Sequence, residues 1–80
     1  MEDAQIRSGI TQTFRDTFGD PAMVITDSMT ASDVDGWDSL THINLIVALE
    51  RAFRIKFTTG EVTKLKNVGD LVSLIQRKTS

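Results

Sequence analysis

The chain has 80 residues, of which 40% are hydrophobic, with a net charge of −2 and no cysteine. A chain of this length buries only about 60% of its unfolded surface or slightly more, so residues 1–80 are expected to form one small domain without a deep enzyme cleft. The lack of cysteine excludes disulfides, thiolate metal sites and a cysteine nucleophile. Any thiol chemistry would have to come from an added group.

The charges are divided unevenly along the chain. Residues 1–50 carry nine acids against two bases, and residues 51–80 carry seven bases against two acids. Because these bases are spread over several predicted elements, they favour a solvated surface over a nucleic-acid site.

The longest apolar run, residues 45–49, is far shorter than the roughly 20 residues of a membrane span, and residues 1–5 lack a basic signal-peptide start. We therefore expect a soluble cytoplasmic protein that binds neither nucleic acid nor membrane.

The N-terminal part of the chain predicts a helix from about Asp3 to Phe18. Apolar residues recur there every four positions, which places them on one side of a helix: Ile6, Ile10, Phe14 and Phe18. Gly19 and Pro21 supply a stop. From Gly19 to Trp37 the periodicity disappears, and a long loop is expected with a few apolar anchors: Val24, Ile25 and Met29. So long a loop in so short a chain is uncommon without a purpose.

A second helix is predicted to follow an N-cap at Asp38. Its apolar stripe is expected to consist of Leu40, Ile43, Ile46, Leu49 and Phe53. His42 falls outside this stripe, so we expect its side chain to be exposed or to face a partner. Trp37, immediately before the cap, is expected to pack on the first turns of the helix with partial exposure.

The C-terminal part of the chain predicts two further helices. Thr58 and Glu61 have the spacing of a capping box, which indicates a short helix from about Gly60 to Lys66. Asn67 can cap a last helix, whose stripe contains Val68, Leu71 and either Leu74 or Ile75. No segment alternates convincingly as a strand. The predicted fold is all-α: a small four-helix bundle with three longer helices, one short third helix and a long loop between helices one and two.

Two patterns suggest chemistry but do not complete it. Asp33, Asp35 and Gly36 match part of a calcium-binding EF-hand loop, but Ala31 and His42 occupy two positions that need carboxylate ligands, so no metal site is expected. Ser39 and His42 could form a nucleophile and base, but no Gly-x-Ser-x-Gly elbow accompanies them. A serine hydrolase is therefore disfavoured.

Ser39 has a second possible role because of its position. With Asp38 as N-cap, Ser39 is the first helical residue, where the free N–H groups and the helix dipole favour a phosphate anion. A phosphodiester on Ser39 would be well placed. For an isolated Asp-Ser pair, however, an ordinary helix cap is the better interpretation.

The longer segment around Ser39, "DVDGWDSLTHINLIVALERAFRIKF", favours a chemical role for the serine over an ordinary helix cap. It resembles the acyl carrier protein family, in which Asp-Ser-Leu opens the second helix and the serine bears 4′-phosphopantetheine. "ITDSM" resembles the family's loop segment, "LIVALERAF" the end of its second helix, and "VGDLVSLI" its final helix. The resemblance therefore covers most of the chain.

The resemblance implies roles for individual residues. Ser39 would be the attachment site for 4′-phosphopantetheine from coenzyme A, and Asp38 would support recognition by the phosphopantetheinyl transferase. Leu40, Val47 and Glu50 would contact partner enzymes. Helix phase and the resemblance together suggest an acyl groove between helices two and three, lined by Leu49, Phe57, Val62 and Leu65. The outward positions of helix two hold Thr41, His42 and Asn44 where carboxylates are common in the family, so apolar contacts are expected to matter more than charge in docking.

The implied function is that of a non-catalytic, monomeric carrier. It would hold acyl intermediates as thioesters and deliver them to acyl-loading, condensing or tailoring enzymes of fatty acid, polyketide or related biosynthesis. An aminoacyl, peptidyl or D-alanyl carrier would share the fold and the prosthetic group, although Gly-Trp-Asp-Ser-Leu is closer to acyl than to peptidyl carriers. A non-carrier helical interaction module and a small serine hydrolase are the alternatives from other classes.

Overall fold

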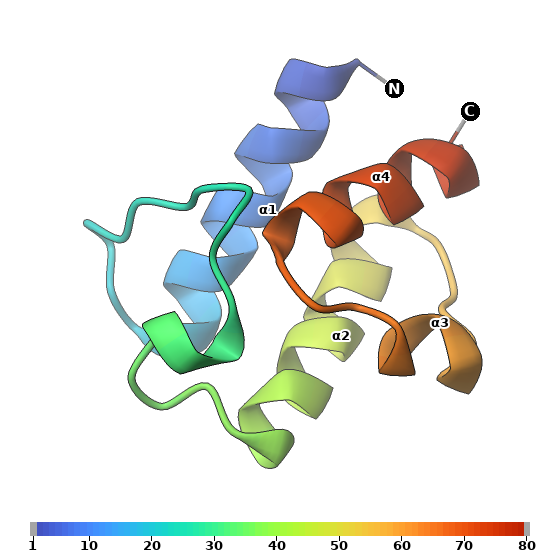
Figure 1. The fold of residues 1–80 in the computed structure, drawn as a ribbon. Helices are drawn as coiled ribbons and strands as arrows, with labels where there is room; N and C mark the ends of the chain where they lie inside the picture. The colour runs from blue at the N-terminus through green and yellow to red at the C-terminus, as the bar shows by residue number, and fades with distance from the viewer. Residues whose placement is uncertain (1, 80) are drawn as a thin grey trace.

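The computed structural model describes residues 2–79, and every regular element among them is helical. The α-helices are α1 (Asp3–Phe18), α2 (Ser39–Phe53), α3 (Thr59–Thr63) and α4 (Val68–Thr79), and a short 3₁₀ helix, η1 (Ala31–Asp33), precedes α2 (Figure 1). The predicted all-α fold of three longer helices and one short third helix is confirmed. The bounds predicted for the first helix are also those observed.

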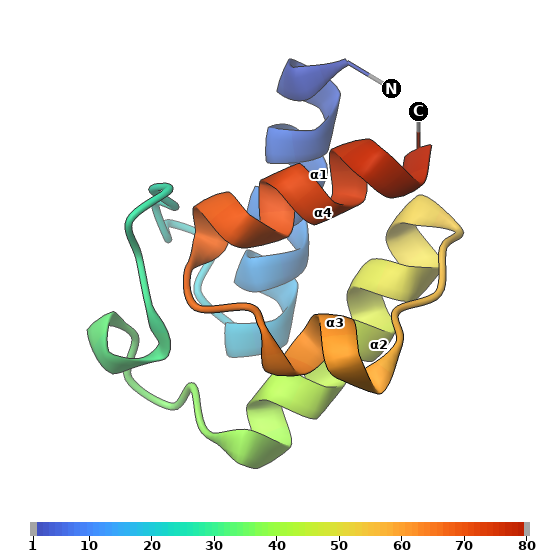
Figure 2. The same ribbon diagram turned by 45° about the vertical axis from the view of Figure 1, so that its right-hand side comes forward.

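The core lies where α1, α2 and α4 meet. It contains three apolar side chains of α1, four of α2 and four of α4: Ile6, Ile10, Phe14, Leu45, Ile46, Leu49, Phe53, Val68, Leu71, Val72 and Ile75. The crossing of α1 and α2 is close, because a Cβ added to Gly9 would lie 2.6 Å from Cζ of Phe53. The beginning of α1 and the end of α4 lie on the same side of the molecule (Figures 1 and 2), where Gln76 Nε2 donates to Asp3 Oδ1 at 2.7 Å.

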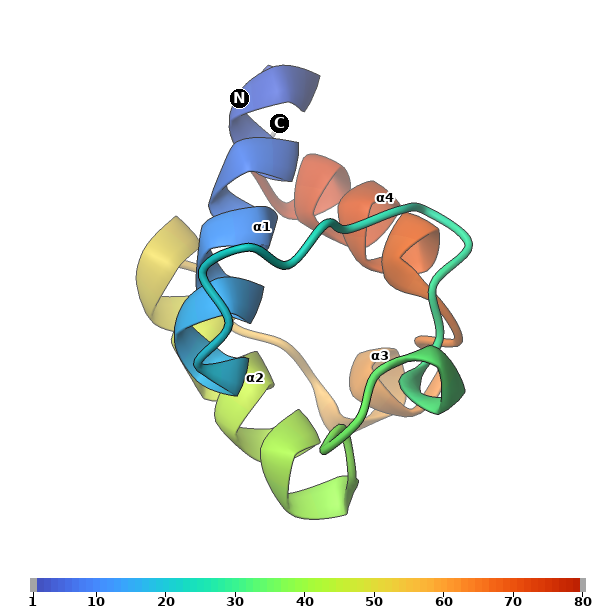
Figure 3. The same ribbon diagram turned by 90° about the vertical axis from the view of Figure 1, so that its left-hand side faces the viewer.

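Residues 19–38 connect α1 to α2 along a path that passes the start of α4 (Figure 3). Two backbone bonds attach this segment to α4, from Gly69 N to Asp27 O at 2.8 Å and from Val68 N to Met29 O at 3.0 Å. The carboxylate of Asp27 also pairs with the guanidinium of Arg7 on α1. Ile25 and Met29 pack against the core, as expected, but Val24 is 72% exposed and anchors nothing.

The predicted apolar stripe of α2 is wrong in its first half. Leu40 and Ile43 are 70% and 60% exposed, whereas Leu45 is fully buried. The reason is the spacing: repeated steps of three residues fall behind the 3.6-residue turn, so Leu40 and Leu49 lie about 180° apart around the helix axis. The buried side of α2 is marked by residues spaced alternately four and three positions apart: His42, Ile46, Leu49 and Phe53. His42 is therefore half-buried, contrary to the expectation of an exposed side chain.

The C-terminal helices keep their predicted caps but differ in their bounds. The Thr58 and Glu61 capping box is present, and Asp70 N donates to Asn67 Oδ1 at 2.8 Å. α3 ends at Thr63, before the predicted Lys66, and Leu65 packs against the core from the segment that follows. Lys78 on α4 forms a 2.8 Å ion pair with Glu61, which ties α3 to α4.

Candidate functional site at the start of α2

Asp38 is the N-cap residue of α2. Its Oδ1 accepts hydrogen bonds from the backbone N of Thr41 at 2.9 Å and from Thr41 Oγ1 at 2.7 Å. These bonds, the backbone one first, lower the pKa of Asp38 below its usual value because they stabilise the carboxylate. The acid therefore stays ionised near neutral pH and fixes the direction of the first helical turn.

Ser39 is the first residue of α2 and is exposed. Within residues 2–79, no hydrogen-bond partner holds its hydroxyl, so the oxygen is free to be modified. The first turn of α2 lies at the end of the molecule away from α4 (Figures 1 and 2), and Leu40 beside it is 70% exposed. An enzyme can thus approach Ser39 without displacing other parts of the described chain.

Trp37 and His42, on either side of Ser39 in the sequence, contact each other through their side chains. Trp37 Nε1 donates to His42 Nδ1 at 3.1 Å, and the two rings stack with a 21° angle between their planes. Trp37 is half-buried against the first turn of α2, as expected, and it also packs edge-on against Phe14 of α1 with ring centroids 5.3 Å apart, a contact that was not predicted. Burial lowers the pKa of His42.

This pair removes the base that a serine hydrolase would need. Because Nδ1 of neutral His42 accepts the Trp37 hydrogen bond, its proton lies on Nε2, and neither ring nitrogen has a free lone pair for the Ser39 proton. Sequence reasoning missed this role of His42 because it placed the residue on the wrong side of the helix.

A small apolar cavity of about 60 Å³ lies between α2 and the start of α4. Trp37 and His42 form part of its wall, and its other lining residues are Ala31, Leu45, Ile46, Leu65, Lys66, Asn67, Val68 and Leu71. Of the four residues expected to line an acyl groove, Leu65 lines this cavity, Leu49 is fully buried in the core, and Phe57 and Val62 are half-buried. The groove stays a prediction.

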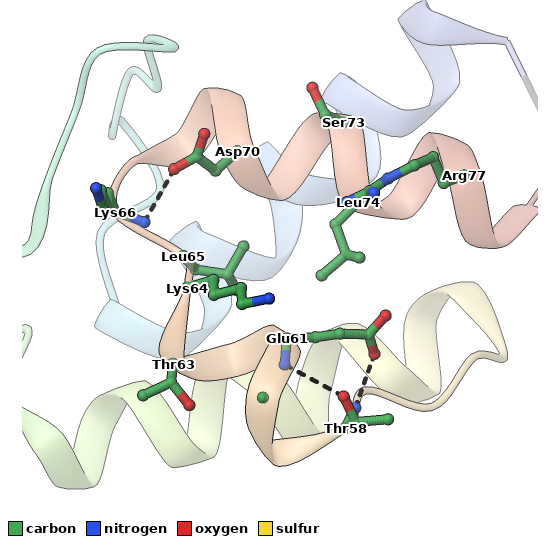
Figure 4. A pocket seen from close by; sticks show the side chains of 11 residues that line it. Thr58, Glu61, Thr63, Lys64, Leu65, Lys66, Asp70, Ser73, Leu74 and Arg77 are labelled. Carbon is green, nitrogen blue, oxygen red and sulfur yellow. Dashed lines mark hydrogen bonds between the residues drawn. The ribbon is translucent and has the colours of Figure 1, made fainter.

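A wider and more open hollow lies between α3 and α4 (Figure 4). Its wall includes Lys64, Lys66 and Arg77 together with the acids Glu61 and Asp70, and Leu74 points from α4 towards α3 (Figure 4). Ser39 does not line it. This hollow is open to solvent and Ser39 is not part of its wall, so we do not connect it with the chemistry of the serine.

The three expected partner contacts differ in their surroundings. Leu40 and Val47 are exposed, the latter by 41%. Glu50 is half-buried, and its Oε2 accepts a hydrogen bond from the backbone N of Phe57 at 2.9 Å. The carboxylate of Glu50 therefore joins α2 to the segment before α3, a structural role that the sequence pattern did not reveal.

No helix in the described part of the chain is long and apolar enough to cross a bilayer.

Comparison with known proteins places these features in a family. A family model described as "Phosphopantetheine attachment site" matches residues 8–75. Acyl carrier protein of Thermosynechococcus vestitus is 36% identical over 61 residues, which cover 76% of this chain and 74% of that protein. Acyl carrier protein of Acidothermus cellulolyticus is 29% identical over 79 residues, covering 99% of this chain and 94% of that protein.

A solved structure shows the same likeness in three dimensions. The solution structure of holo acyl carrier protein from Geobacter metallireducens has a TM-score of 0.85 and 50% sequence identity, covering 90% of this chain and 83% of that one. The family model, the relatives and the fold agree. The chain belongs to the phosphopantetheine-binding acyl carrier protein family.

Proposed function

We propose that Ser39 carries the covalently attached 4′-phosphopantetheine of this acyl carrier. The observation that supports this most strongly is the place of Ser39: an exposed serine with a free hydroxyl, first in α2 and directly after the Asp38 cap, in a chain of the phosphopantetheine-attachment family. Ser28 also follows an acid, but it lies between α1 and α2, outside any helix.

The residues around Ser39 fit a phosphodiester. The N-terminus of a 15-residue helix offers the positive end of its dipole, which favours an anion there. Asp38 also carries a negative charge, but its Oδ1 is held by Thr41 in the cap. We propose that Asp38 acts both as this cap and as a contact for the phosphopantetheinyl transferase.

The protein is a non-catalytic carrier, and its chain contributes position and recognition. The attached arm supplies the thiol that the cysteine-free chain lacks, and acyl groups are held on it as thioesters. Tethering raises the effective concentration of the cargo at enzymes that dock on the carrier. We propose that residues 1–80 act as one monomeric cytoplasmic domain that serves acyl-loading, condensing or tailoring enzymes of fatty acid or polyketide biosynthesis. An aminoacyl, peptidyl or D-alanyl cargo is the alternative.

The attachment site is tested with coenzyme A and a broad-specificity transferase. Wild type, Ser39→Ala and Ser28→Ala are treated in parallel, and their intact masses are measured. Wild type and Ser28→Ala should gain one phosphopantetheine group, and Ser39→Ala should gain none. Modification of Ser39→Ala would reject the assignment.

We also propose that a sufficiently long acyl chain folds back between α2 and α3. The half-buried side chains of Phe57, Val62 and Leu65, and the small cavity beside Leu65, support this idea. Loading a medium-length acyl group should change the chemical shifts of these residues and of Leu49 relative to the holo form. If these shifts do not change, the cargo stays exposed.

A further inference from the structure

An exposed apolar stripe runs along the outer side of α2. Leu40, Ile43 and Val47 are 70%, 60% and 41% exposed, and they are spaced three and four residues apart. Steps of this kind keep side chains on neighbouring positions of one helix face. The stripe begins beside Ser39 and leads towards the other end of α2, where Arg51 follows Val47 by one helical turn.

The C-terminal end of α2 is surrounded by positive charge. Val47, Glu50, Arg51, Arg54, Ile55 and Lys56 line a shallow hollow there. The carboxylate of Glu50, which accepts the hydrogen bond from Phe57 N, offsets one of the three positive charges around this hollow. Within residues 2–79, no ion pair involves Arg51, Arg54 or Lys56. We call these three residues the cationic end of α2.

Arg54 has an unusual backbone conformation for its residue type. Its φ and ψ are 57° and 47°, and among residues 2–79 it is the only residue other than glycine with a positive φ. Helices commonly end in this left-handed conformation, but glycine is the usual residue there because a Cβ is strained. Glycine would allow the same cap bond from the backbone N of residue 54 to Glu50 O. The sequence instead places a long cationic side chain beside the hollow, which points to a role for its charge.

The two ends of α2 carry opposite charges. The exposed acids Asp33 and Asp35, and the cap Asp38, lie beside or shortly before Ser39. Arg54 lies about 22 Å from Ser39 along the helix, given a rise of about 1.5 Å per residue. A uniformly anionic surface such as a membrane or a nucleic acid would attract one end and repel the other. A protein surface with a local group of carboxylates meets only the cationic end.

We propose that the apolar stripe and the cationic end of α2 dock an acyl-processing enzyme whose surface carries carboxylates about 20 Å from the opening that receives the arm. This proposal rests on the proposed function, because the arm on Ser39 must enter that enzyme. The stripe supplies contact area, and the cationic end fixes the orientation of the helix on the partner. Opposite charges at the two ends disfavour the reversed orientation.

The test uses a condensing enzyme from the same organism that has a cysteine nucleophile and accepts the acyl group from the wild-type carrier. Each holo carrier is loaded with an α-haloacyl group, which the enzyme's cysteine thiolate attacks, forming a C–S bond and releasing halide. Intact mass verifies that all variants are loaded equally. The rate of crosslinking is then compared for wild type, Arg54→Gly, the double variant Arg51→Gln with Arg54→Gln, and Lys64→Gln, which removes an exposed base directly after α3.

Crosslinking should be about fivefold slower for Arg54→Gly and about tenfold slower for the double variant, while Lys64→Gln stays within about twofold of wild type. The melting temperature of Arg54→Gly should be at least that of wild type, because glycine relieves the strained conformation. A slow but stable Arg54→Gly variant cannot be explained by poor folding. Replacing the partner's carboxylates by lysine should restore the rate of a carrier with Arg51→Glu and Arg54→Glu.

Equal rates for wild type and the double variant would overturn the proposal, as would an equal loss in Lys64→Gln. A third result would also overturn the proposal: the wild-type carrier binds vesicles of phosphatidylglycerol, Arg54→Gly does not bind them, and the rate of crosslinking is the same for both. These outcomes differ from failure of the proposed function. In that case the intact mass would show no arm on Ser39, and no variant would be loaded.

Discussion

The two ends of α2 are built in different ways. At the N-terminal end, Asp38 caps the helix through Thr41, and the next residues, Ser39 and Leu40, are exposed. At the C-terminal end, Phe53 is buried over Gly9 of α1, and Glu50 holds the backbone of the following segment. The first end is held by local hydrogen bonds, and the second by contacts between helices. One helix can therefore present a reactive serine at one end while its other end is anchored in the core.

The largest effect that separates the two ends is expected from their apolar residues. Phe53→Ala should lower the free energy of unfolding by about 3–5 kcal/mol, because it removes a buried ring and leaves a cavity against Gly9. Leu40→Ala at the exposed end should change it by no more than about 0.5 kcal/mol. Urea unfolding followed by circular dichroism measures both. Similar losses in the two variants would show that the exposed end is also part of the core.

The outer face of α2 predicts a difference between apolar and acidic contacts in docking. Val47→Ala should slow acyl transfer to a cognate enzyme by about fivefold or more, since truncating an apolar anchor typically costs about 1 kcal/mol or more. Glu50→Gln should have a smaller effect, because a glutamine oxygen can still accept the hydrogen bond from Phe57 N. Added salt should slow association only moderately. A steep salt dependence together with an unchanged Val47→Ala would mean that docking depends on charge alone.

At the N-terminal end, two substitutions of Asp38 separate the cap from the charge. Asp38→Ala removes the acceptor for Thr41 and should lower the melting temperature by about 5 °C. Asp38→Asn can still cap the helix, so its melting temperature should stay close to that of wild type. If the transferase recognises the carboxylate, both variants should be modified more slowly. Normal modification of Asp38→Asn would assign Asp38 to the cap alone.

A smaller effect is expected from His42 as the pH changes. Its folded-state pKa is below the ordinary 6.5, so the unfolded chain binds protons more readily as the pH falls through this value. The free energy of unfolding should therefore be higher above pH 6.5 and should decrease as the pH falls towards the lower folded-state pKa. Protonation also removes the Nδ1 acceptor of the bond from Trp37, the only tryptophan, so its fluorescence should change in the same range.

The control for this prediction is His42→Gln, which should lack the change in stability and in fluorescence just below pH 6.5. Asp27 and Asp38 also have lowered pKa values, from Arg7 and from the Thr41 bonds respectively. Their stabilisation is complete above about pH 3.8 and decreases only as the pH falls below it, so it does not overlap with the histidine range. If His42→Gln shows the same pH dependence of stability and fluorescence as wild type, the change does not come from His42.

The parts of the fold that were predictable from the sequence depend on short-range rules. The first helix follows from four apolar residues at a regular spacing of four, and the caps at Asp38 and Asn67 follow from residue type and position. The stripe of α2 was not predictable in the same way, since steps of three drift around the helix and only packing against α1 and α4 selects the buried side. This error also placed His42 wrongly. The left-handed conformation of Arg54, where glycine is usual, and the bond from Phe57 N to Glu50 could not be predicted from residue type and position.

The most direct measurement of the central claim is the mass of the protein isolated from its own cells, with the modified residue located by fragmentation. We expect one phosphopantetheine group on Ser39, with part of the protein carrying additional mass that hydroxylamine releases as expected for a thioester. That additional mass would also identify the cargo. An unmodified Ser39 in cells that contain an active transferase, or an arm on another serine, would contradict the account.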